Sequence, residues 1–355
     1  MTTRADRVQA RLQEESLDAL LVTDLTNLRY LTGFTGTNGL CVVGPELRRF
    51  VTDFRYLERS AAEVGGFERE RAPAEFLAAL ADGWPAGRLR VGFEDHKLTV
   101  RQLTRLRELV PGRVELVAAG GHVENGRAVK DAAELDAIAA AAGVADAALE
   151  EMLAAGLAGR TERAVAAAFE AEVRARGAEP AFPAIVAAGP SGAAPHHTPG
   201  DRVIAPGELV TIDFGARLDG YHSDCTRTYA CGEVSAELRA IHALVLAAQV
   251  AGLEALRPGP EGREIDAVAR DVIASGGHAE HFGHGLGHGV GLEVHEAPRL
   301  GQTGREPLRE GAVVTVEPGV YVPGLGGVRI EDLVVVAADG ARVLSGHAKT
   351  LTTVD

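Results

Sequence analysis

The segment TIDFGARLDGYHSDCTRTY (211–229) holds the feature that most restricts the fold, an Asp219-Gly220 pair between two β-rich runs. Both central positions of a two-residue hairpin turn need positive φ, and an Asp-Gly pair meets that need. Because the turn sets how its two strands pair, counting back from it places Asp213 opposite Thr226. The sequence therefore predicts an antiparallel hairpin with a defined register.

This register makes neighbours of two acidic residues, Asp213 and Asp224. Asp224 lies two positions from Thr226 and therefore on the same face of the hairpin. The two carboxylates are then diagonal neighbours, with Cβ atoms roughly 7 Å apart. Aspartate is disfavoured within strands, so the pair is either two solvent-facing carboxylates or part of a metal or acid–base site. Asp219 is excluded because the turn uses it.

Length and composition indicate a globular protein of two domains. The chain has 355 residues, which is long for one domain. Hydrophobic residues make up 46% and charged residues 24%, so burial can offset the entropy of ordering.

The formal net charge of −14 disfavours nucleic acid and anionic lipid as partners. The N-terminus lacks the apolar core of a signal peptide, and no run of about 18 apolar residues occurs, so we expect no membrane partner.

The cysteines indicate the compartment. Cys41, Cys225 and Cys231 are few, odd in number and without CxxC spacing. This usage argues against a disulfide framework and fits a reducing cytosol. We therefore expect a cytoplasmic protein whose cysteines are small buried hydrophobic residues.

The first part of the chain, residues 1–125, alternates strand-like and helical segments, which predicts an α/β domain. Expected helices cover residues 4–15, 54–64, 74–81 and 98–110, and expected strands cover 19–22, 39–43, 49–52 and 89–93. Glycines at positions 112, 120, 121 and 126 punctuate the stretch that follows, which we interpret as a linker. The domain boundary is expected near residues 118–128.

The second part, residues 126–355, changes character and predicts an α+β domain. Its curved, mostly antiparallel sheet is expected to be covered by helices. Expected helices begin at Asp131 and cover 161–176, 236–256 and 262–274, and expected strands cover 209–214, 312–316 and 330–336.

Five histidines lie within HAEHFGHGLGHGVGLEVHE (278–296), interleaved with glycines. Imidazole transfers protons and binds metals, and glycine lets the backbone approach a site closely. A nucleotide-binding loop would need a preceding strand and a following helix, and neither is evident. His288 and His295 are an odd number of positions apart, so a bend or bulge is needed if both serve one site. Spacing does not choose a ligand among the histidines, although we interpret His278 and His281 as structural.

Two further carboxylates stand in apolar strands. Glu317 ends the strand in VVTVEPGVYV (313–322), and Glu331 lies within GVRIEDLVVV (327–336). A glutamate in such a run is costly unless it is paired or metal-bound. Arg329 and Glu331 are two positions apart and share a strand face, so a buried ion pair is the alternative to a metal site.

Four carboxylates and one imidazole in these contexts predict a dinuclear metal centre. Oxygen-rich ligation with one nitrogen suits Mn²⁺ or Co²⁺ better than a structural zinc. Four carboxylates offset two divalent charges, and such ion pairs share and activate a water molecule. The residues therefore imply hydrolysis without naming the substrate.

These motifs resemble the pita-bread metallopeptidases, specifically the Xaa-Pro peptidases prolidase (Xaa-Pro dipeptidase) and aminopeptidase P. DLTNLRYLTGFTG (24–36) and TDFRYLERS (52–60) are similar to the creatinase-like N-terminal domain. The segments from IDFG to SDCTRT, GHGLGHGVGLEVHE, TVEPGVY and GGVRIED resemble the metal-binding motifs in their usual order. The resemblance implies a creatinase-like domain (1–125) followed by a pita-bread catalytic domain (126–355).

The resemblance also implies the metals and their ligands. Two divalent ions are expected, Mn²⁺ first, with Co²⁺ or Zn²⁺ as alternatives. Asp213, Asp224 and Glu331 are implied as bridging or bidentate ligands and Glu317 also as the base toward the shared water; the full ligand set is Asp213, Asp224, His288, Glu317 and Glu331.

Substrate residues follow from the same resemblance. His196 in APHHTPGD (194–201) matches a histidine near the scissile bond, with neighbouring His197 as its competitor in the sequence. His295 matches a substrate-orienting histidine that stabilises the developing oxyanion. His284 and Arg329 match positions of the substrate pocket or behind the ligands.

The choice between peptidases depends on one arginine. A dipeptidase must recognise the free carboxylate of the product proline, best done with Arg, and Arg299 in HEAPRL (295–300) is the candidate. Its alternative is an exposed loop arginine. We expect an Xaa-Pro dipeptidase acting on short proline-containing peptides, with aminopeptidase P as the alternative. Creatinase-type hydrolase, methionine aminopeptidase and a non-catalytic binding protein are remoter, and a homodimer is implied by resemblance.

Overall fold

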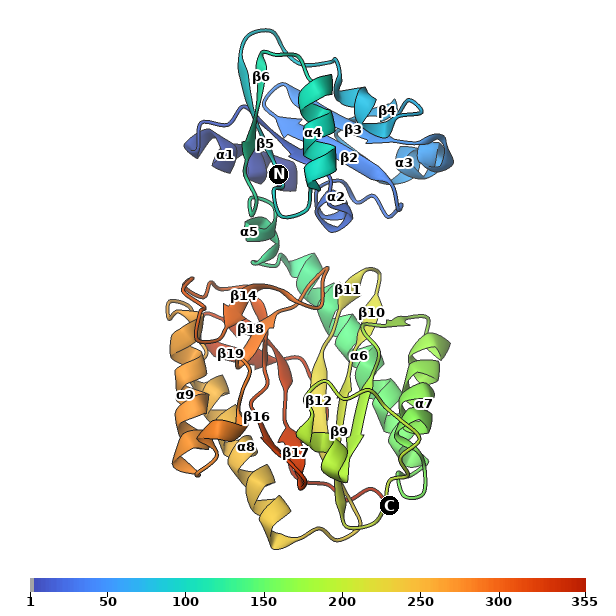
Figure 1. Cartoon of the computed structure of the whole chain (residues 1–355), viewed down its shortest axis with the longest axis vertical. Helices are drawn as coiled ribbons and strands as arrows, with labels where there is room; N and C mark the ends of the chain where they lie inside the picture. Colours follow the sequence, from blue (N-terminus) through green and yellow to red (C-terminus); the bar gives the residue numbers. More distant parts are fainter. Residues whose placement is uncertain (1–2) are drawn as a thin grey trace. The chain divides into compact units, whose positions relative to one another are not determined.

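The computed structural model describes residues 3–355, which form two compact units, one ending at Arg127 and the other covering Ala128–Asp355 (Figure 1). The predicted boundary between residues 125 and 126 falls inside the short helix α5 (Glu124–Arg127).

The N-terminal unit is built on one six-stranded mixed sheet with the order β4-β3-β2-β1-β5-β6. β1 is buried along its length and pairs antiparallel with β2 and parallel with β5. The strands are β1 (Ala19–Val22), β2 (Gly39–Gly44), β3 (Leu47–Thr52), β4 (Glu68–Arg71), β5 (Leu89–Phe93) and β6 (Val114–Ala118).

Capping residues mark the start of helices in this unit. At the start of α4, the Thr99 hydroxyl oxygen accepts a hydrogen bond from the Gln102 backbone N–H, and the Gln102 side-chain oxygen accepts one from the Thr99 backbone N–H. The helices are α1 (Arg4–Glu14), α2 (Leu25–Thr32), α3 (Leu57–Glu63), α4 (Val100–Leu109) and α5, with 3₁₀ turns η1 (Phe54–Tyr56) and η2 (Phe76–Leu80).

The linker expected over residues 112–126 is wrong. Strand β6 lies within it and pairs parallel with β5, from Leu89 opposite Val114 to Phe93 opposite Ala118. The glycines flank this strand instead of loosening the chain, so they mark its ends. The prediction also missed α2 and β4.

In the C-terminal unit, Ala128–Asp355, all paired strands are antiparallel and form four sheets. The sheets have the orders β11-β10-β7, β12-β9-β8, β14-β13-β15-β18-β19 and β16-β17. The strands are β7 (Glu179–Pro180), β8 (Ile185–Ala188), β9 (Glu208–Phe214), β10 (Ala216–Leu218), β11 (Tyr221–His222), β12 (Cys225–Cys231), β13 (Gly287–Gly289), β14 (Glu296–Leu300), β15 (Val313–Val316), β16 (Gly319–Val322), β17 (Gly326–Arg329), β18 (Asp332–Ala337) and β19 (Gly340–Val343).

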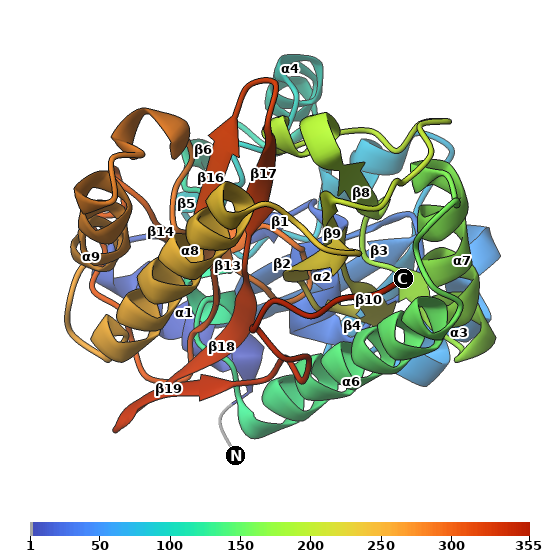
Figure 2. The same cartoon turned by 90° about the horizontal axis from the view of Figure 1, so that it is seen from below.

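Two helix pairs flank these strands (Figures 1 and 2). One pair, α6 and α7, packs with β8, β9 and β12 in one apolar core, and the other, α8 and α9, packs with β15 to β18 in a second core. The helices are α6 (Ala132–Ala154), α7 (Glu162–Ala175), α8 (Ala236–Ala255) and α9 (Gly262–Ser275), with 3₁₀ turns η3 (Gly189–Ala193) and η4 (Ala279–His281). The expected α+β class is confirmed.

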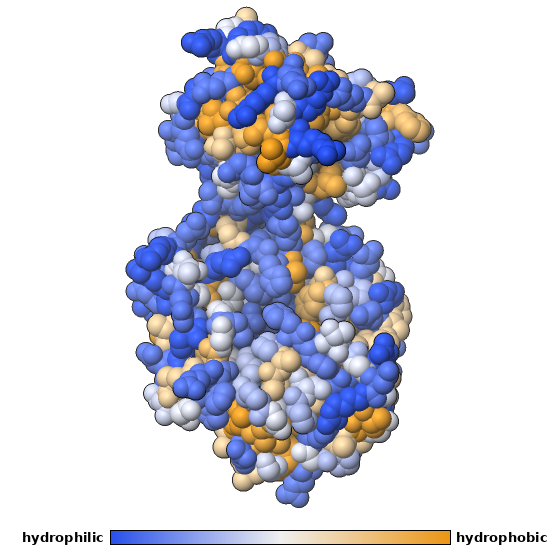
Figure 3. All heavy atoms as spheres, viewed as in Figure 1, coloured by the Kyte–Doolittle hydropathy of each residue, from blue (hydrophilic) through white to orange (hydrophobic). Residues whose placement is uncertain are grey.

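Helix α8 is long and apolar enough to cross a membrane by length and composition alone. Its residues Leu238, Ile241, Val245 and Ala248 are buried in the second core. Core helices pass the same test, so this single helix is weak evidence for a membrane span. On the face of the C-terminal unit drawn in Figure 3, polar and neutral residues predominate and apolar atoms form small groups.

The hairpin register predicted from Asp219-Gly220 is confirmed. Both turn residues have positive φ, 47° at Asp219 and 81° at Gly220, and further along the strands Thr226 lies opposite Asp213. The paired strands are interrupted near Gly215, where an added Cβ would lie 2.1 Å from the Ser223 carbonyl oxygen. Glycine is therefore required where the chain approaches the segment that carries Asp224.

The strand expected over residues 330–336 begins two residues late. β17 ends at Arg329 and β18 begins at Asp332, so Glu331 lies between strands. The shared strand face assumed for Arg329 and Glu331 is therefore wrong. Both side chains still reach Thr226, because the Arg329 Nε donates to Thr226 Oγ1 and Thr226 Oγ1 donates to Glu331 Oε2.

Candidate metal centre

Five carboxylate and imidazole side chains from four separate segments converge in the C-terminal unit. Their ligand atoms form two overlapping groups within 4.8 Å, one of His288, Glu317 and Glu331 and one of Asp213, Asp224 and Glu331. Glu331 belongs to both groups. All five residues predicted as ligands are therefore brought to one place.

The two carboxylate oxygens of Asp213, on β9, differ in their hydrogen bonding. Its Oδ2 accepts from the Arg329 Nη2 at 2.7 Å. Its Oδ1 is buried and has no hydrogen-bond partner among residues 3–355. A buried carboxylate oxygen without a donor is unfavourable unless a cation satisfies it, so this oxygen is suited to bind a metal ion.

Glu331 is held rigidly by strand β12. Its side chain is 2% exposed, and its Oε2 accepts from Thr226 Oγ1 at 2.7 Å. Its backbone N–H donates to the Thr226 carbonyl at 3.0 Å. The residue shared by both ligand groups is thus fixed at backbone and side chain by a single threonine.

His288 presents its Nε2 to the carboxylates. Nε2 lies 3.3 Å from Glu317 Oε1 and 3.6 Å from Asp224 Oδ2. The other ring nitrogen, Nδ1, lies 3.2 Å from the Gly289 carbonyl oxygen, an arrangement that orients metal-binding imidazoles. The irregularity predicted between His288 and His295 is present, as a register shift between His288 and Gly289.

Glu317 follows β15 directly. Thr315 in that strand donates to Glu317 Oε1 at 3.1 Å and accepts from the His288 backbone N–H at 3.1 Å. Burial alone would raise the pKa of Glu317, but the hydrogen bond and charge of His288 outweigh it and lower that pKa. Glu317 is therefore the carboxylate that stays ionised most readily.

Asp224 and Glu331 have the opposite electrostatic character. Burial raises the pKa of Asp224 well above its ordinary value, and the charges of Glu331, Asp213 and Glu317 raise it further. Burial, followed by the charges of Glu317 and Asp213, does the same to the pKa of Glu331. Mutual repulsion of carboxylates in a low-dielectric site is relieved when cations replace the protons. The donor set, four carboxylates and one imidazole, fits two hard-to-borderline divalent ions.

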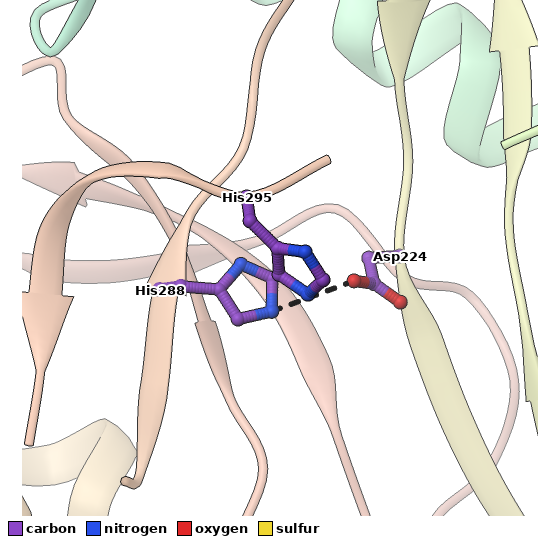
Figure 4. A group of neighbouring side chains, drawn as sticks. All are labelled: Asp224, His288 and His295. Carbon is purple, nitrogen blue, oxygen red and sulfur yellow. Dashed lines mark ion pairs between the residues drawn. The ribbon is translucent and has the colours of Figure 1, made fainter. Parts of the chain in front are cut away.

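His295 lies beside the same centre. Its ring centroid is 4.3 Å from that of His288, and Figure 4 shows both rings directed toward the carboxylate of Asp224. The ligand atoms of Asp224, His288 and His295 form a third group within 4.8 Å. His295 is exposed to the cleft on one side. Partial burial of its ring, and after that the nearby His288, lowers its pKa, which favours the neutral imidazole.

The centre lies in a cleft of about 1110 Å³. The cleft is lined by the residues predicted to meet substrate, His196, His284, His295, Arg299 and Arg329, and by the five predicted ligands. His197 also lines it, but its Nε2 lies 2.7 Å from Glu162 Oε2, a fully buried carboxylate. His197 is thus engaged in structure, whereas exposed His196 is available to substrate.

A tyrosine that sequence reasoning missed connects two of these residues. The Tyr321 hydroxyl lies 2.8 Å from His284 Nε2 and 3.1 Å from Arg329 Nη1. It belongs to β16 and lies four positions after Glu317 in EPGVY. Thr226 and Thr315 were missed as well. Their signal was available, because each is a polar residue in a strand whose buried neighbours are largely apolar.

Comparison with known proteins identifies the family. The model of metallopeptidase family M24 matches residues 136–338, and the model of the creatinase/prolidase N-terminal domain matches residues 4–129.

The chain belongs to metallopeptidase family M24.

Individual relatives cover the whole chain. An uncharacterized peptidase, YqhT of Bacillus subtilis, is 41% identical over 94% of this chain and 95% of its own. The structure of an Xaa-Pro dipeptidase from Bacillus anthracis is 38% identical, with a TM-score of 0.94 and coverage of 99% of both chains. An X-Pro aminopeptidase structure from Thermotoga maritima is 33% identical, with a TM-score of 0.89 and coverage of 97% of this chain and 100% of that one. The predicted family, the two-domain fold and the assignment as a peptidase are confirmed.

Proposed function

We propose that this M24 chain is an Xaa-Pro dipeptidase that uses two divalent metal ions. One observation carries the proposal. Asp213, whose Oδ1 has no hydrogen-bond partner among the described residues, groups with Asp224 and Glu331 in the lining of a cleft that also contains exposed His196, His295 and Arg299. The same cleft therefore holds ligand atoms for metals and polar side chains for a peptide.

The ligands we propose are Asp213, Asp224, His288, Glu317 and Glu331, and Mn²⁺ is the ion that suits this oxygen-rich set best. Two such ions, when bound, would activate water for attack and polarise the scissile carbonyl. Glu317, which keeps its negative charge most readily, accepts the proton of the attacking water. It can later pass this proton to the leaving nitrogen of proline, because a general base becomes a general acid in the reverse sense.

Two cleft histidines handle the peptide. Neutral His295, whose ring is adjacent to His288, donates to the oxygen on which negative charge develops; such donors contribute about 2.7–4 kcal/mol where one has been removed. His196, also exposed in the cleft lining, orients the scissile bond. His284 is held by Tyr321 and shapes the pocket wall.

The substrate class follows from the chemistry of proline. An Xaa-Pro bond has no amide N–H, and the ring restricts φ. An enzyme that binds its substrate as an added β-strand loses a donor there. A cleft that attacks the carbonyl directly needs no such donor, which is why this site suits the Xaa-Pro bond.

The dipeptide preference depends on Arg299. Its side chain is exposed in the cleft lining, and a guanidinium suits the free carboxylate of the product proline. An aminopeptidase would instead leave that end of the cleft open to a longer chain.

The test compares an Xaa-Pro dipeptide with an Xaa-Pro-Yaa tripeptide on Mn²⁺-loaded protein. We expect the higher kcat/KM for the dipeptide; a higher value for the tripeptide would instead establish an aminopeptidase. Arg299→Ala should raise KM for the dipeptide by about 10-fold or more, the loss of one charge-assisted hydrogen bond, and leave KM for the tripeptide unchanged. Absence of cleavage with Mn²⁺, Co²⁺ and Zn²⁺ would reject the proposed function.

A homodimer in the cytoplasm completes the proposal. The three cysteines are free and buried, as a reducing compartment allows. Light scattering after size exclusion measures the assembly directly, and a monomer at working concentration would contradict the dimer.

A further inference from the structure

A second layer of charge lies behind the metal ligands. On β12, Thr226 faces the centre and Arg227, the next residue, faces the opposite side of the sheet. Arg227 is 2% exposed. Its Nη2 donates to Asp332 Oδ1 at 2.7 Å, and its Nη1 donates to the Glu331 carbonyl oxygen. A buried guanidinium thus touches both the ligand Glu331 and the residue after it.

Both carboxylate oxygens of Asp332 accept hydrogen bonds. It is 0% exposed, and its Oδ2 accepts from the Gln249 side chain at 2.9 Å and from Lys349 Nζ at 2.8 Å. Lys349 also donates to Gln249 Oε1 at 3.0 Å. Buried charges persist in a protein only when they are paired and hydrogen-bonded in this way, so Asp332 depends on both Arg227 and Lys349.

The C-terminal segment closes the network. The carbonyl of His347 accepts from Arg227 Nε at 3.0 Å and from Nη2 at 2.7 Å. The segment is held in turn by Asp146 of α6, which accepts from the Gly346 N–H at 2.7 Å. Residues 346–349 therefore reach the back of the sheet at the point where Glu331 leaves it.

Glu331 needs this external support because it lies between β17 and β18, outside the strand ladders. Its N–H bonds to the Thr226 carbonyl and its carbonyl accepts from Arg227. The Cys225 thiol also donates to that carbonyl, at 3.2 Å. The backbone of Glu331 is therefore held by residues 225–227 of β12, which fix where its carboxylate begins.

We propose that Lys349, through Asp332 and Arg227, positions Glu331 and thereby sets the affinity of the metal centre. Lys349, Asp332 and Arg227 are positioning residues, since none of them contacts the ligand atoms of the centre. The inference rests on the proposed function to the extent that Glu331 is a metal ligand.

The chain offers a matched control. It has only three lysines, Lys97, Lys130 and Lys349. Lys97, in the N-terminal unit, pairs with Asp24 at 3.2 Å and has a side chain 31% exposed, against 25% for Lys349. Lys97→Met and Lys349→Met therefore remove the same charge from lysines of similar exposure, but only Lys349 contacts the network behind Glu331.

The experiment measures Mn²⁺ affinity of the full chain by competition with a chromogenic chelator, alongside Tm with and without Mn²⁺. We expect about 10-fold weaker Mn²⁺ binding in Lys349→Met, because partners outside the ligand sphere typically contribute 10–100-fold to metal affinity. Lys349→Arg should restore the affinity and Lys97→Met should leave it unchanged. At saturating Mn²⁺, kcat should approach the wild-type value, since every ligand is intact.

A purely structural role predicts a different pattern. Lys349→Met would then lower Tm of the metal-free protein while Mn²⁺ affinity stayed at the wild-type value, and that result overturns the proposal. Asp332→Asn supplies a second variant of nearly unchanged shape with the same expectation. If the unaltered chain itself bound no Mn²⁺, the proposed function would fall together with this inference; unchanged affinity in the variants alone rejects only the inference.

Discussion

Buried carboxylates occur in both units, but Glu94 and Asp213 differ in how their oxygens are hydrogen-bonded. In the N-terminal unit, Glu94 is 2% exposed and both of its oxygens are bound. Its Oε2 accepts from the backbone N–H groups of Thr23 and Asp24 at 2.7 and 2.8 Å, and its Oε1 accepts from the Asn27 side chain at 2.7 Å. In the catalytic unit, the Asp213 Oδ1 is buried with no donor among the described residues.

The difference separates a structural carboxylate from a functional one. Glu94 connects the end of β5 to the start of α2, and its donors offset the cost of burial. Asp213, Asp224 and Glu331 face one another instead, and Arg329 pairs only with Asp213, so the repulsion among the three carboxylates is relieved when cations bind. Burial of charge is therefore shared by both regions, and the convergence of several carboxylates within 4.8 Å of one another distinguishes the candidate metal centre.

The largest effect is expected from Asp224→Asn, which removes one charge at nearly constant shape. Peptidase activity should fall by more than about 100-fold, the upper range seen when mere supporting residues of metal sites are changed. The metal-free protein should become more stable, because repulsion among the buried carboxylates decreases. Thermal unfolding in EDTA checks this second point, and a lower Tm than wild type would contradict the comparison with Glu94.

His295→Ala tests the donor from the cleft wall. Loss of one oxyanion donor typically lowers kcat by about 10²–10³-fold. Because His295 is exposed and is not needed to complete either ligand group of the five residues, Mn²⁺ content should stay near wild type. Metal analysis beside steady-state kinetics decides this; loss of metal together with kcat would make His295 a ligand.

Glu94→Gln should have the opposite effects of Asp224→Asn: it should lower stability and leave activity unchanged. The amide would place N–H groups against donors that now bind carboxylate oxygens, which should cost about 1–3 kcal/mol of the free energy of unfolding. Activity per folded molecule should not change, because Glu94 lies in the other unit. Denaturant unfolding gives the free energy, and a gain of stability would show that Glu94 is not saturated as its contacts indicate.

The smallest and most gradual effect is expected from pH. The pKa values of Asp224 and Glu331 are raised well above the ordinary 3.8 and 4.5. Their contribution to the stability of the metal-free protein is therefore complete below those ordinary values and is lost as pH rises through the raised pKa values. Glu317 behaves in the opposite way because its pKa is lowered. Its contribution to stability is present above the ordinary value of 4.5 and is lost as pH falls through the lowered pKa.

Stabilisation by Mn²⁺ should consequently increase with pH, because the ions displace fewer protons. A series of Tm measurements in EDTA and in Mn²⁺ follows both trends, and Asp224→Asn isolates the part due to one carboxylate. Equal stabilisation by Mn²⁺ at pH 5 and pH 8 would show that the carboxyl protons do not compete with metal.

Much of the secondary structure could be predicted from local patterns. β1 and β5 have the predicted bounds, and the long helices α6, α8 and α9 begin within about one residue of expectation. Short or irregular elements could not, as β6 shows. Val114 and Leu116 have too short an apolar pattern to reveal a strand, and β6 is defined by its pairing with β5.

The candidate site divides in the same way. Asp213 and Asp224 could be placed side by side from the turn alone, because hairpin register is a local property. Glu331 could be suspected from its apolar surroundings but not located. Its anchor, Thr226, lies 105 positions away in the sequence, and no periodicity relates two segments so far apart.

The sequence by itself determined the hairpin, the two-domain organisation and the family, because turn residues, periodicity and motifs are local or linear properties. Only the tertiary structure decided which carboxylate oxygen lacks a donor, which histidine faces Glu162 and which faces the cleft, and that the chain end reaches Arg227 behind Glu331. Those properties depend on which segments approach one another in space, and hydrogen-bond satisfaction can be counted only after they have done so.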